Sequence, residues 1–331
     1  MMTRTTLADI AAKTGYSQTT VGKVLNGGNA SIRISESTRN KIIEVARKMH
    51  YHPNAMASAL RKGNADIIGL LGDSMAGRRI AMLIQEIERH ADARSYRLLT
   101  SMTHDDIDSM YSNYLALMNH GAAGVICLAH DYPDMREHMC ELFANDDRIV
   151  FLEQPQWGSG HYVGSSRQKA LTEYFRYQKQ CGCRRFALIH ANLRWHSERA
   201  LLADYQAALK DNDIEYIPEL SVEYPDEDGS LEYNCDYIIN EMIIPHKPDV
   251  LFSDDAEHAL YLQNQLLARK IPLPVICGGN HDPFFKIAAP AIDSLDPHYD
   301  RIASALIGAV IDRQNFVSGI TVDADAPVPA C

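Results

Sequence analysis

Hydrophobic positions in the first 63 residues recur at helical spacing in three short segments. Thr6, Ser17 and Ser35 stand immediately before these segments, and such residues cap helix N-termini. The inward-facing positions are Leu7, Ile10 and Ala11 in the first segment, Val21, Val24 and Leu25 in the second, and Ile42, Ala46 and Met49 in the third. Gly15 separates the first two segments, and Gly27-Gly28 follows the second, where glycine favours a helix stop. The pattern predicts an all-α head that contains a helix-turn-helix.

From Asp66 onward, short apolar runs alternate with helical patterns. The runs span residues 67–71, 98–100, 125–128, 149–152, 186–189, 250–252 and 275–277. The helical stripes between them include Ile80, Leu83, Ile84, Ile87 and Ala91, and further on Leu201, Tyr205, Ala208 and Leu209. This alternation is typical of an α/β body with parallel sheets covered by helices. The length of the body and a break near Val163–Ser165 predict two sheets, one in each of two lobes.

The charge of the chain changes sign between the head and the body. The chain of 331 residues carries a net charge of -11, yet residues 1–63 hold ten Lys and Arg against three Asp and Glu. The rest of the chain has a net charge of -18. A basic head on an acidic body favours contact of the head, and not of the body, with a polyanion such as nucleic acid.

The composition excludes collagenous, disordered and mini-protein classes. No run of about 18 apolar residues occurs, so we expect no transmembrane helix and no membrane partner. The first residues run directly into a helical pattern and do not resemble a secretory signal. Seven Cys, an odd number, then indicate reduced thiols and a cytoplasmic protein.

The second helix of the head leaves Gln18, Thr19, Gly22 and Lys23 facing outward near its start. A recognition helix presents residues at these places to base edges in the major groove. Gln can form two hydrogen bonds with adenine, and Lys can reach the acceptors of guanine. A solvated helix face has the same pattern, but the basic head and the glycine turn favour contact with DNA.

Two further segments of the head fit a DNA partner. Ser35, Thr38 and Arg39 lie at the start of the third helix, where they can anchor a phosphate. The stretch 54–63 is too short for a stable isolated helix, so we expect it to fold only against a partner. Leu60, near its end, would be buried by insertion between base steps in a minor groove.

Five motifs follow one another along the head. They are Thr6-Leu7-Ala8-Asp9-Ile10-Ala11, Ser17-Gln18-Thr19-Thr20-Val21, Val24-Leu25-Asn26, Ser35-Glu36-Ser37-Thr38-Arg39, and Tyr51-His52-Pro53-Asn54 with Leu60 after it. This series resembles the lactose-repressor (LacI/GalR) family. The resemblance implies DNA contacts by Thr6, Ser17, Gln18, Thr19, Lys23, Asn26, Ser35, Thr38, Asn54, Ala57 and Leu60.

The same resemblance implies a domain organisation. It divides the chain into a DNA-binding domain at 1–52, a hinge helix at 53–63, a first lobe at 64–163 with 293–320, and a second lobe at 164–292 with 321–331. The two lobes would form a periplasmic-binding-protein-like core, and the chain would act as a homodimer on a near-palindromic double-stranded DNA operator. Lys23 stands where the family usually has Arg, and Gly22 where it usually has Ser. We therefore expect an operator that differs from the family's standard one.

Ligands of such folds bind beyond the carboxyl ends of the strands. The candidates there are Asp73, Arg78, Arg79, Ser101 and His130 in the first lobe, and Asn192, Trp195, Arg199, Tyr224, Asp255, Asn280 and Asp282 in the second. Carboxylates and Arg around an aromatic ring are typical of a sugar site. The resemblance thus implies a repressor of carbohydrate-uptake or catabolic genes, gated by a small-molecule effector, with no cofactor and no metal.

The cleft departs from the family pattern in its charged residues. Leu201 replaces an Arg that clamps the sugar, and Asp254-Asp255 replaces Asn-Asp. The site is therefore not a standard one for a neutral sugar. Arg78 and Arg79 could meet a phosphate or carboxylate of an anionic sugar, or could be a solvated pair.

Two other functions have some support in the sequence. A protein partner docking on the acidic body could replace the small-molecule effector. Gly279-Asn280-His281-Asp282 is similar to one box of the metallophosphoesterase family, but the upstream Asp-x-His box of that family is missing. We expect no enzymatic activity.

Overall fold

The computed structural model describes residues 5–26, 34–51, 66–72, 78–103, 106–128, 132, 135–225 and 230–327. The chain divides into two compact units, Met1–Asp66 and Ile67–Cys331, which are the head and the body. The expected glycine stop at 27–28 and the expected hinge helix at 53–63 lie outside the described residues. No helix in the described ranges is long and apolar enough to cross a membrane.

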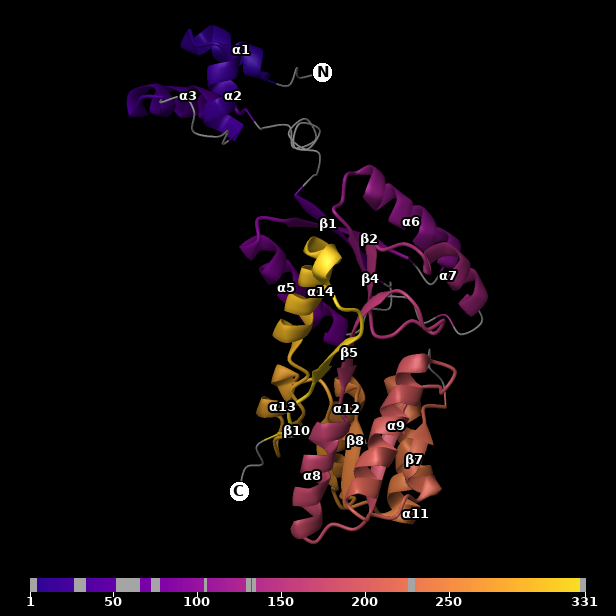
Figure 1. Cartoon of the computed structure of the whole chain (residues 1–331). Helices are drawn as coiled ribbons and strands as arrows, with labels where there is room; N and C mark the ends of the chain where they lie inside the picture. The colour runs from indigo at the N-terminus through magenta and orange to yellow at the C-terminus, as the bar shows by residue number, and fades with distance from the viewer. Residues whose placement is uncertain are drawn as a thin grey trace. The chain divides into compact units, whose positions relative to one another are not determined.

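The head contains the three helices that its sequence predicts (Figure 1). They are α1 (Leu7–Thr14), α2 (Gln18–Asn26) and α3 (Glu36–Lys48). Their shared core consists of Ile10, Val21, Val24, Ile42 and Ala46. This confirms the helix-turn-helix and its inward-facing residues, because the apolar spacing allows each helix to bury one face only.

Local hydrogen bonds set the helix starts in the head. The Thr6 hydroxyl accepts from the Asp9 N–H, and the Asp9 carboxylate accepts from the Thr6 N–H, so the two form a capping box. Ser17 and Ser35 cap α2 and α3 through the N–H groups three residues later, at 3.1 and 3.2 Å. Gly15 ends α1 at φ 78°, a conformation that glycine adopts without strain.

The first lobe of the body is a parallel sheet with helices on both faces (Figure 1). Its described strands run in the order β11-β5-β4-β3-β1-β2. Their bounds are β1 Ile67–Gly72, β2 Arg97–Met102, β3 Val125–Cys127, β4 Ile149–Leu152, β5 His161–Ser166 and β11 Ile320–Asp323. Helices α5 (Arg78–Ala93) and α14 (Tyr299–Ile311) cover one face, and α6 (Ile107–Asn119) and α7 (Arg136–Phe143) cover the other.

The second lobe repeats this architecture. Its described strands run in the order β10-β9-β8-β6-β7 and are likewise parallel. Their bounds are β6 Phe186–His190, β7 Ser221–Glu223, β8 Val250–Ser253, β9 Val275–Gly278 and β10 Asp293–Ser294. Helices α8 (Gln168–Gln180) and α9 (His196–Asp211) pack on one face. On the other lie α10 (Leu231–Ile238), α12 (Ala256–Ala268) and α13 (Pro283–Ile287), with the short α11 (Ile244–His246) nearby.

The seven strands expected from apolar runs are all present, while β5, β7, β10 and β11 have no such run. The lobe boundaries also differ slightly from those expected. The first sheet continues to Ser166 and Asp323, and Asp293–Ser294 belongs to the second sheet. The boundaries expected at 163, 292 and 320 therefore lie a few residues too early, because β5, β10 and β11 are themselves the strands that lead into the crossovers.

Candidate functional site

The start of α2 presents polar side chains on the side opposite the head core. Gln18 and Thr19 are exposed, while Val21 is fully buried. Lys23 is half-buried at the following turn. Two donor-bearing side chains thus stand on a helix whose rotation is fixed by packing, as direct reading of base edges requires.

The hydroxyl groups near the helix starts are engaged inside the head. Thr6 donates to Asp9 at 2.7 Å. Ser35 donates to the Thr38 hydroxyl at 2.8 Å, and Thr38 donates to Tyr16 at 3.4 Å. Of these residues, Thr6 and Ser35 remain exposed, and each could donate its hydroxyl hydrogen to a phosphate by rotating away from its partner in the head.

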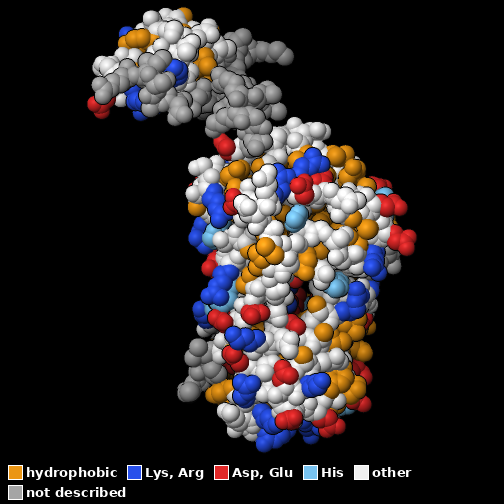
Figure 2. All heavy atoms as spheres, in the orientation of Figure 1, with side chains coloured by type: hydrophobic (Ala, Val, Ile, Leu, Met, Phe, Trp, Pro, Cys, Tyr) orange, Lys and Arg blue, Asp and Glu red, His pale blue; other side chains and the backbone are white. Residues whose placement is uncertain are grey.

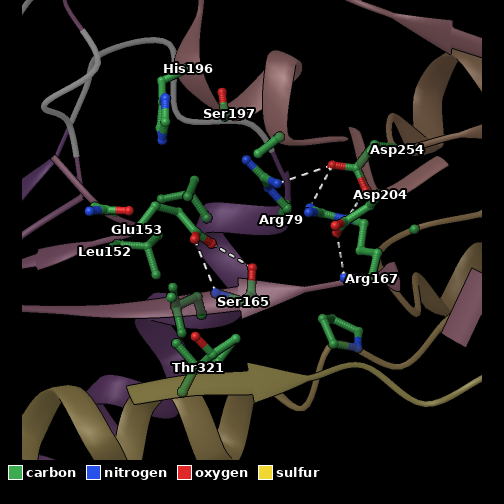
Figure 3. Close-up of a pocket in the computed structure, with 18 of the residues that line it drawn as sticks. Arg79, Leu152, Glu153, Ser165, Arg167, His196, Ser197, Asp204, Asp254 and Thr321 are labelled. Atoms are coloured by element: carbon green, nitrogen blue, oxygen red, sulfur yellow. Dashed lines mark hydrogen bonds and ion pairs between the residues drawn. The ribbon is translucent and has the colours of Figure 1, made fainter. Parts of the chain in front are cut away.

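Two adjoining cavities lie between the lobes of the body. Their volumes are about 230 and 260 Å³, and both are lined by Arg79, Ile80, Glu198 and Asp254. The first cavity also takes in Glu153, Ser165, Arg167 and Asp204, as the close-up shows (Figure 3). We call the two together the interlobe cleft.

Ion pairs cross the interlobe cleft. Asp254, which follows β8, accepts from Arg167 through both its oxygens at 3.0 Å and from the Arg79 guanidinium at 3.0 Å (Figure 3). Arg79 belongs to α5 of the first lobe. Beside this group, Arg78 donates to Asp282, which follows β9. The two arginines at the start of α5 are therefore bound to carboxylates of the second lobe.

Gly279 leaves room for the central carboxylate. A Cβ atom at this position would lie 1.9 Å from Asp254 Oδ1, which is far inside van der Waals contact. Asp254 and Arg167 side chains are 15% and 13% exposed, so their ion pair is largely shielded from water. Burial alone would lower the pKa of Arg167, but the charges of Asp254 and Glu153 raise it above its ordinary value.

Three further carboxylates face the first cavity, and each accepts from a backbone N–H. Glu153 accepts from Ser165, Asp204 from Arg167, and Glu198 from Ala191. Burial raises the pKa of Glu198, and the neighbouring charge of Asp254 raises it further. Burial likewise raises the pKa of Asp204.

The second cavity is built around an aromatic pair and an amide. Tyr224 stacks on the His258 ring at 4.0 Å between centroids. Asp255 caps α12 through the N–H groups of Glu257 and His258. Asn280 is 5% exposed, and its Oδ1 has no hydrogen-bond partner among the described residues.

Comparison with known proteins identifies the head. Residues 6–54 match the sequence model of "Bacterial regulatory proteins, lacI family". The curated relatives include the HTH-type transcriptional repressor PurR of Serratia proteamaculans (strain 568), which is 22% identical over 318 residues, or 93% of this chain and 90% of the relative. The head, at residues 6–54, belongs to the LacI family.

Solved structures share the fold of this chain, with its LacI-family head, along its whole length. The Lac repressor bound to ONPG superposes with a TM-score of 0.81 at 17% identity, covering 98% of both chains. The transcriptional regulator CelR in complex with cellobiose gives a TM-score of 0.66 at 18% identity, covering 97% of this chain and 98% of that one. The predicted fold, a helical head and a two-lobed body, is confirmed. The protein is a DNA-binding transcriptional regulator.

Part of the expected effector set lines the interlobe cleft of the body. Arg78, Arg79, Tyr224, Asp255 and Asn280 line the second cavity, and Asp282 binds Arg78 beside it. The sequence did not single out Glu153, Ser165, Arg167, Glu198 or Asp204, whereas Asp254 was a strand-end candidate and lines both cavities. The sequence could have indicated Glu198, because it lies in the first turn of α9, the helix that follows β6.

Four expected residues lie elsewhere. Ser101 borders a separate hollow beside α6. Asn192 donates to Glu223 at 2.8 Å, and Arg199 donates to the carbonyl oxygens of Leu193 and Arg194. Trp195 lies under the Arg194 guanidinium, 4.8 Å from the ring centroid. Asn192 thus binds the end of β7, and Arg199 binds the loop before α9, which a strand-end position alone could not reveal.

Some predicted residues have no structural test. Asp73, His130, Asn54, Ala57 and Leu60 lie outside the described residues. Asn26 ends α2, but its side chain is not among those described.

The motif that is similar to a metallophosphoesterase box takes part in the cleft. Asp282 binds Arg78 and caps α13 through the Phe284 N–H. The His281 ring lies 3.4 Å from Lys286 Nζ. The described residues bring together no three His, Cys, Asp or Glu side chains in an arrangement that could hold a metal ion.

Proposed function

We propose that this LacI-family regulator represses transcription as a homodimer on a near-palindromic DNA operator, with base contacts from Gln18, Thr19 and Lys23. Phosphate contacts would come from Thr6, Ser17, Ser35 and Thr38, and the segment 53–63 would form the hinge with Leu60 as its wedge. Carbohydrate-uptake or catabolic genes are the proposed targets, and the cytoplasm is the proposed location. The regulator that shares this fold in complex with cellobiose supports the choice of genes.

The exposure of Gln18 and Thr19 on a helix held by buried Val21 carries the proposal. The charges of the head and the body support this proposal, since the excess of Lys and Arg lies in the first 63 residues. On the face of the body shown in Figure 2, acidic and basic side chains are interspersed and form no broad basic surface. DNA is therefore a partner for the head and not for the body.

The test starts from operators selected from random duplex DNA by the full chain. Gln18→Ala should weaken binding to the selected operator by about tenfold or more and relax the preference at one base pair, because a two-point contact with adenine contributes about 1–3 kcal/mol. Asn40→Ala, an exposed change on α3, is the matched control and should leave affinity within about twofold. Equal affinity of the Gln18 variant and the unchanged protein would contradict the assignment of α2.

Gating is proposed to occur in the interlobe cleft, because its charged groups come from both lobes. A molecule that binds there with different affinity for two relative positions of the lobes shifts the balance between them. A change between the lobes would then alter the fit of two heads on one operator. A protein partner on the acidic body is the second candidate, and a cleft that binds no small molecule would favour it.

A further inference from the structure

The interlobe cleft contains more carboxylates than cations. Its first cavity is lined by Arg79 and Arg167 against Glu153, Glu198, Asp204 and Asp254. Its second cavity adds Arg78, and with it Asp255 and Glu257. The balance is negative in both compartments, so the field inside the cleft favours a positive ligand.

The cations of the cleft are already paired. Asp254 accepts from Arg167 through both oxygens and from Arg79 through one (Figure 3). Asp282 accepts from Arg78 through one oxygen, and the Arg78 guanidinium also lies 4.3 Å from the centroid of the Phe284 ring. An anionic ligand would have to displace one of these carboxylates, and the anionic sugar considered from the sequence is therefore disfavoured.

Two of the carboxylates have unused oxygens. Glu198 and Asp204 form no ion pair with any described residue. Glu198 accepts from the Ala191 N–H at 3.0 Å, and Asp204 accepts from the Arg167 N–H at 2.8 Å and is also near the Gln168 N–H. Their second oxygens remain as acceptors beside the first cavity. Burial raises the pKa of both groups, although the charge of Arg167, and for Glu198 also that of Arg79, acts in the opposite sense.

In the second cavity, a buried acceptor without a partner indicates independently that the ligand supplies a hydrogen-bond donor. Asn280 is nine-tenths buried, lines this cavity, and keeps its Oδ1 without a partner among the residues described. A buried acceptor left unpaired opposes folding. A ligand that brings N–H or O–H groups would remove this cost.

These observations concern the interlobe cleft, and what we infer from them rests on the function proposed above for that cleft. We propose that the interlobe cleft binds a cationic, hydroxyl-rich small molecule of the amino-sugar class, with its ammonium group held by Glu198 and Asp204 and another donor on Asn280. Hydroxyl groups of the ligand meet the remaining acceptors, and the ring is of a size that a cavity of about 230 Å³ admits.

The experiment is calorimetric titration of the full chain at neutral pH and one ionic strength. The probes are glucosamine, galactosamine and mannosamine, each beside its neutral parent sugar and the 6-phosphate of that parent. At least one amino sugar should bind tenfold or more tighter than its parent, which corresponds to about 1.4 kcal/mol. The 6-phosphates should give no binding.

Variants assign the effect to the two carboxylates. Glu198→Gln and Asp204→Asn should each remove the preference for the amine and leave any binding of the neutral parent. Glu88→Gln, an exposed change on α5, is the matched control and should preserve the preference. Because the glutamine and asparagine variants lose a buried charge and no volume, they are expected to fold.

Three results would overturn the proposal: no amino sugar binds, a 6-phosphate binds as tightly as the amine, or the preference survives both carboxylate changes. Operator binding by the head is measured without any effector. A failure in the cleft therefore leaves the DNA-binding function standing, and a failure of operator binding leaves the titration interpretable.

Discussion

Glu198 and Asp254 line the same cleft, but their carboxylates have different partners. Asp254 is neutralised by two guanidinium groups. Glu198 keeps a single backbone donor, and burial together with the charge of Asp254 raises its pKa, although Arg79 and Arg167 act in the opposite sense. Such an uncompensated charge opposes folding and is retained where a ligand uses it.

Glu198→Gln should therefore stabilise the body at neutral pH. Because the folded protein holds the carboxyl pKa above its ordinary value of 4.5, the opposition to folding exists at pH values above that pKa and vanishes below 4.5, where both states are protonated. The gain in Tm over the unchanged protein should shrink as the pH falls from neutral toward 4.5. Thermal unfolding across this range checks the slope, with exposed Glu88→Gln as a control that should show no gain. A gain that grows on acidification would contradict the assignment.

At the scale of helices and strands, local signals were sufficient for the head and for the buried strands. Thr6, Ser17 and Ser35 cap helices because the cap depends on residues at most three positions away. Strands covered on both faces carry continuous apolar runs, so they are visible in sequence.

Strands that the sequence did not predict account for some of the cleft residues that it also did not predict. β5 reads His161–Ser166 with two buried residues, and β11 has one, so neither shows a run. Ser165 and Arg167 stand at the end of β5, hence these two cleft residues were missed as well. Glu153 directly follows β4, a predicted strand, and it was missed although its strand-end position was visible in the sequence. Whether a strand-end side chain turns to the cleft or to its own loop, as Arg199 does, depends on partners that sequence spacing does not fix.

The capping of α3 gives a prediction at this scale. Ser35→Ala removes the acceptor for the Thr38 N–H and the contact with the Thr38 hydroxyl, and it should destabilise the head by about 1 kcal/mol. Hydrogen exchange of amides in α3 should accelerate accordingly in the absence of DNA. Asn40→Ala on the same helix should instead slow exchange slightly, since alanine is the better helix former. Unchanged protection in the Ser35 variant would show that the cap does not hold α3.

At the scale of the whole body, the ion pairs of the cleft connect segments far apart in the chain. Arg79 and Asp254 are 175 residues apart, and Arg78 and Asp282 are 204 apart. They join α5 of the first lobe to the ends of β8 and β9 of the second. These two ion pairs, which we call the clasp, thus hold the lobes together. An effector that moves the lobes has to preserve or break them.

Asp254→Asn should loosen the clasp. It leaves Arg79 and Arg167 without their shared charge in a site that is mostly buried, and it should destabilise the body by on the order of 3 kcal/mol. Hydrogen exchange should rise at the start of α5 and in the loop after β9, while α8 and α12 keep their protection. Gly279→Ala should have the same effect without changing a charge, because its Cβ would occupy the place of Asp254 Oδ1. Exposed Asp300→Asn and the helical Gly308→Ala, whose Cβ would meet only Arg94 at 3.9 Å, are the controls. If both cleft variants exchange like the controls, the two lobes are held by packing and crossovers alone, and an effector need not displace any ion pair to move them.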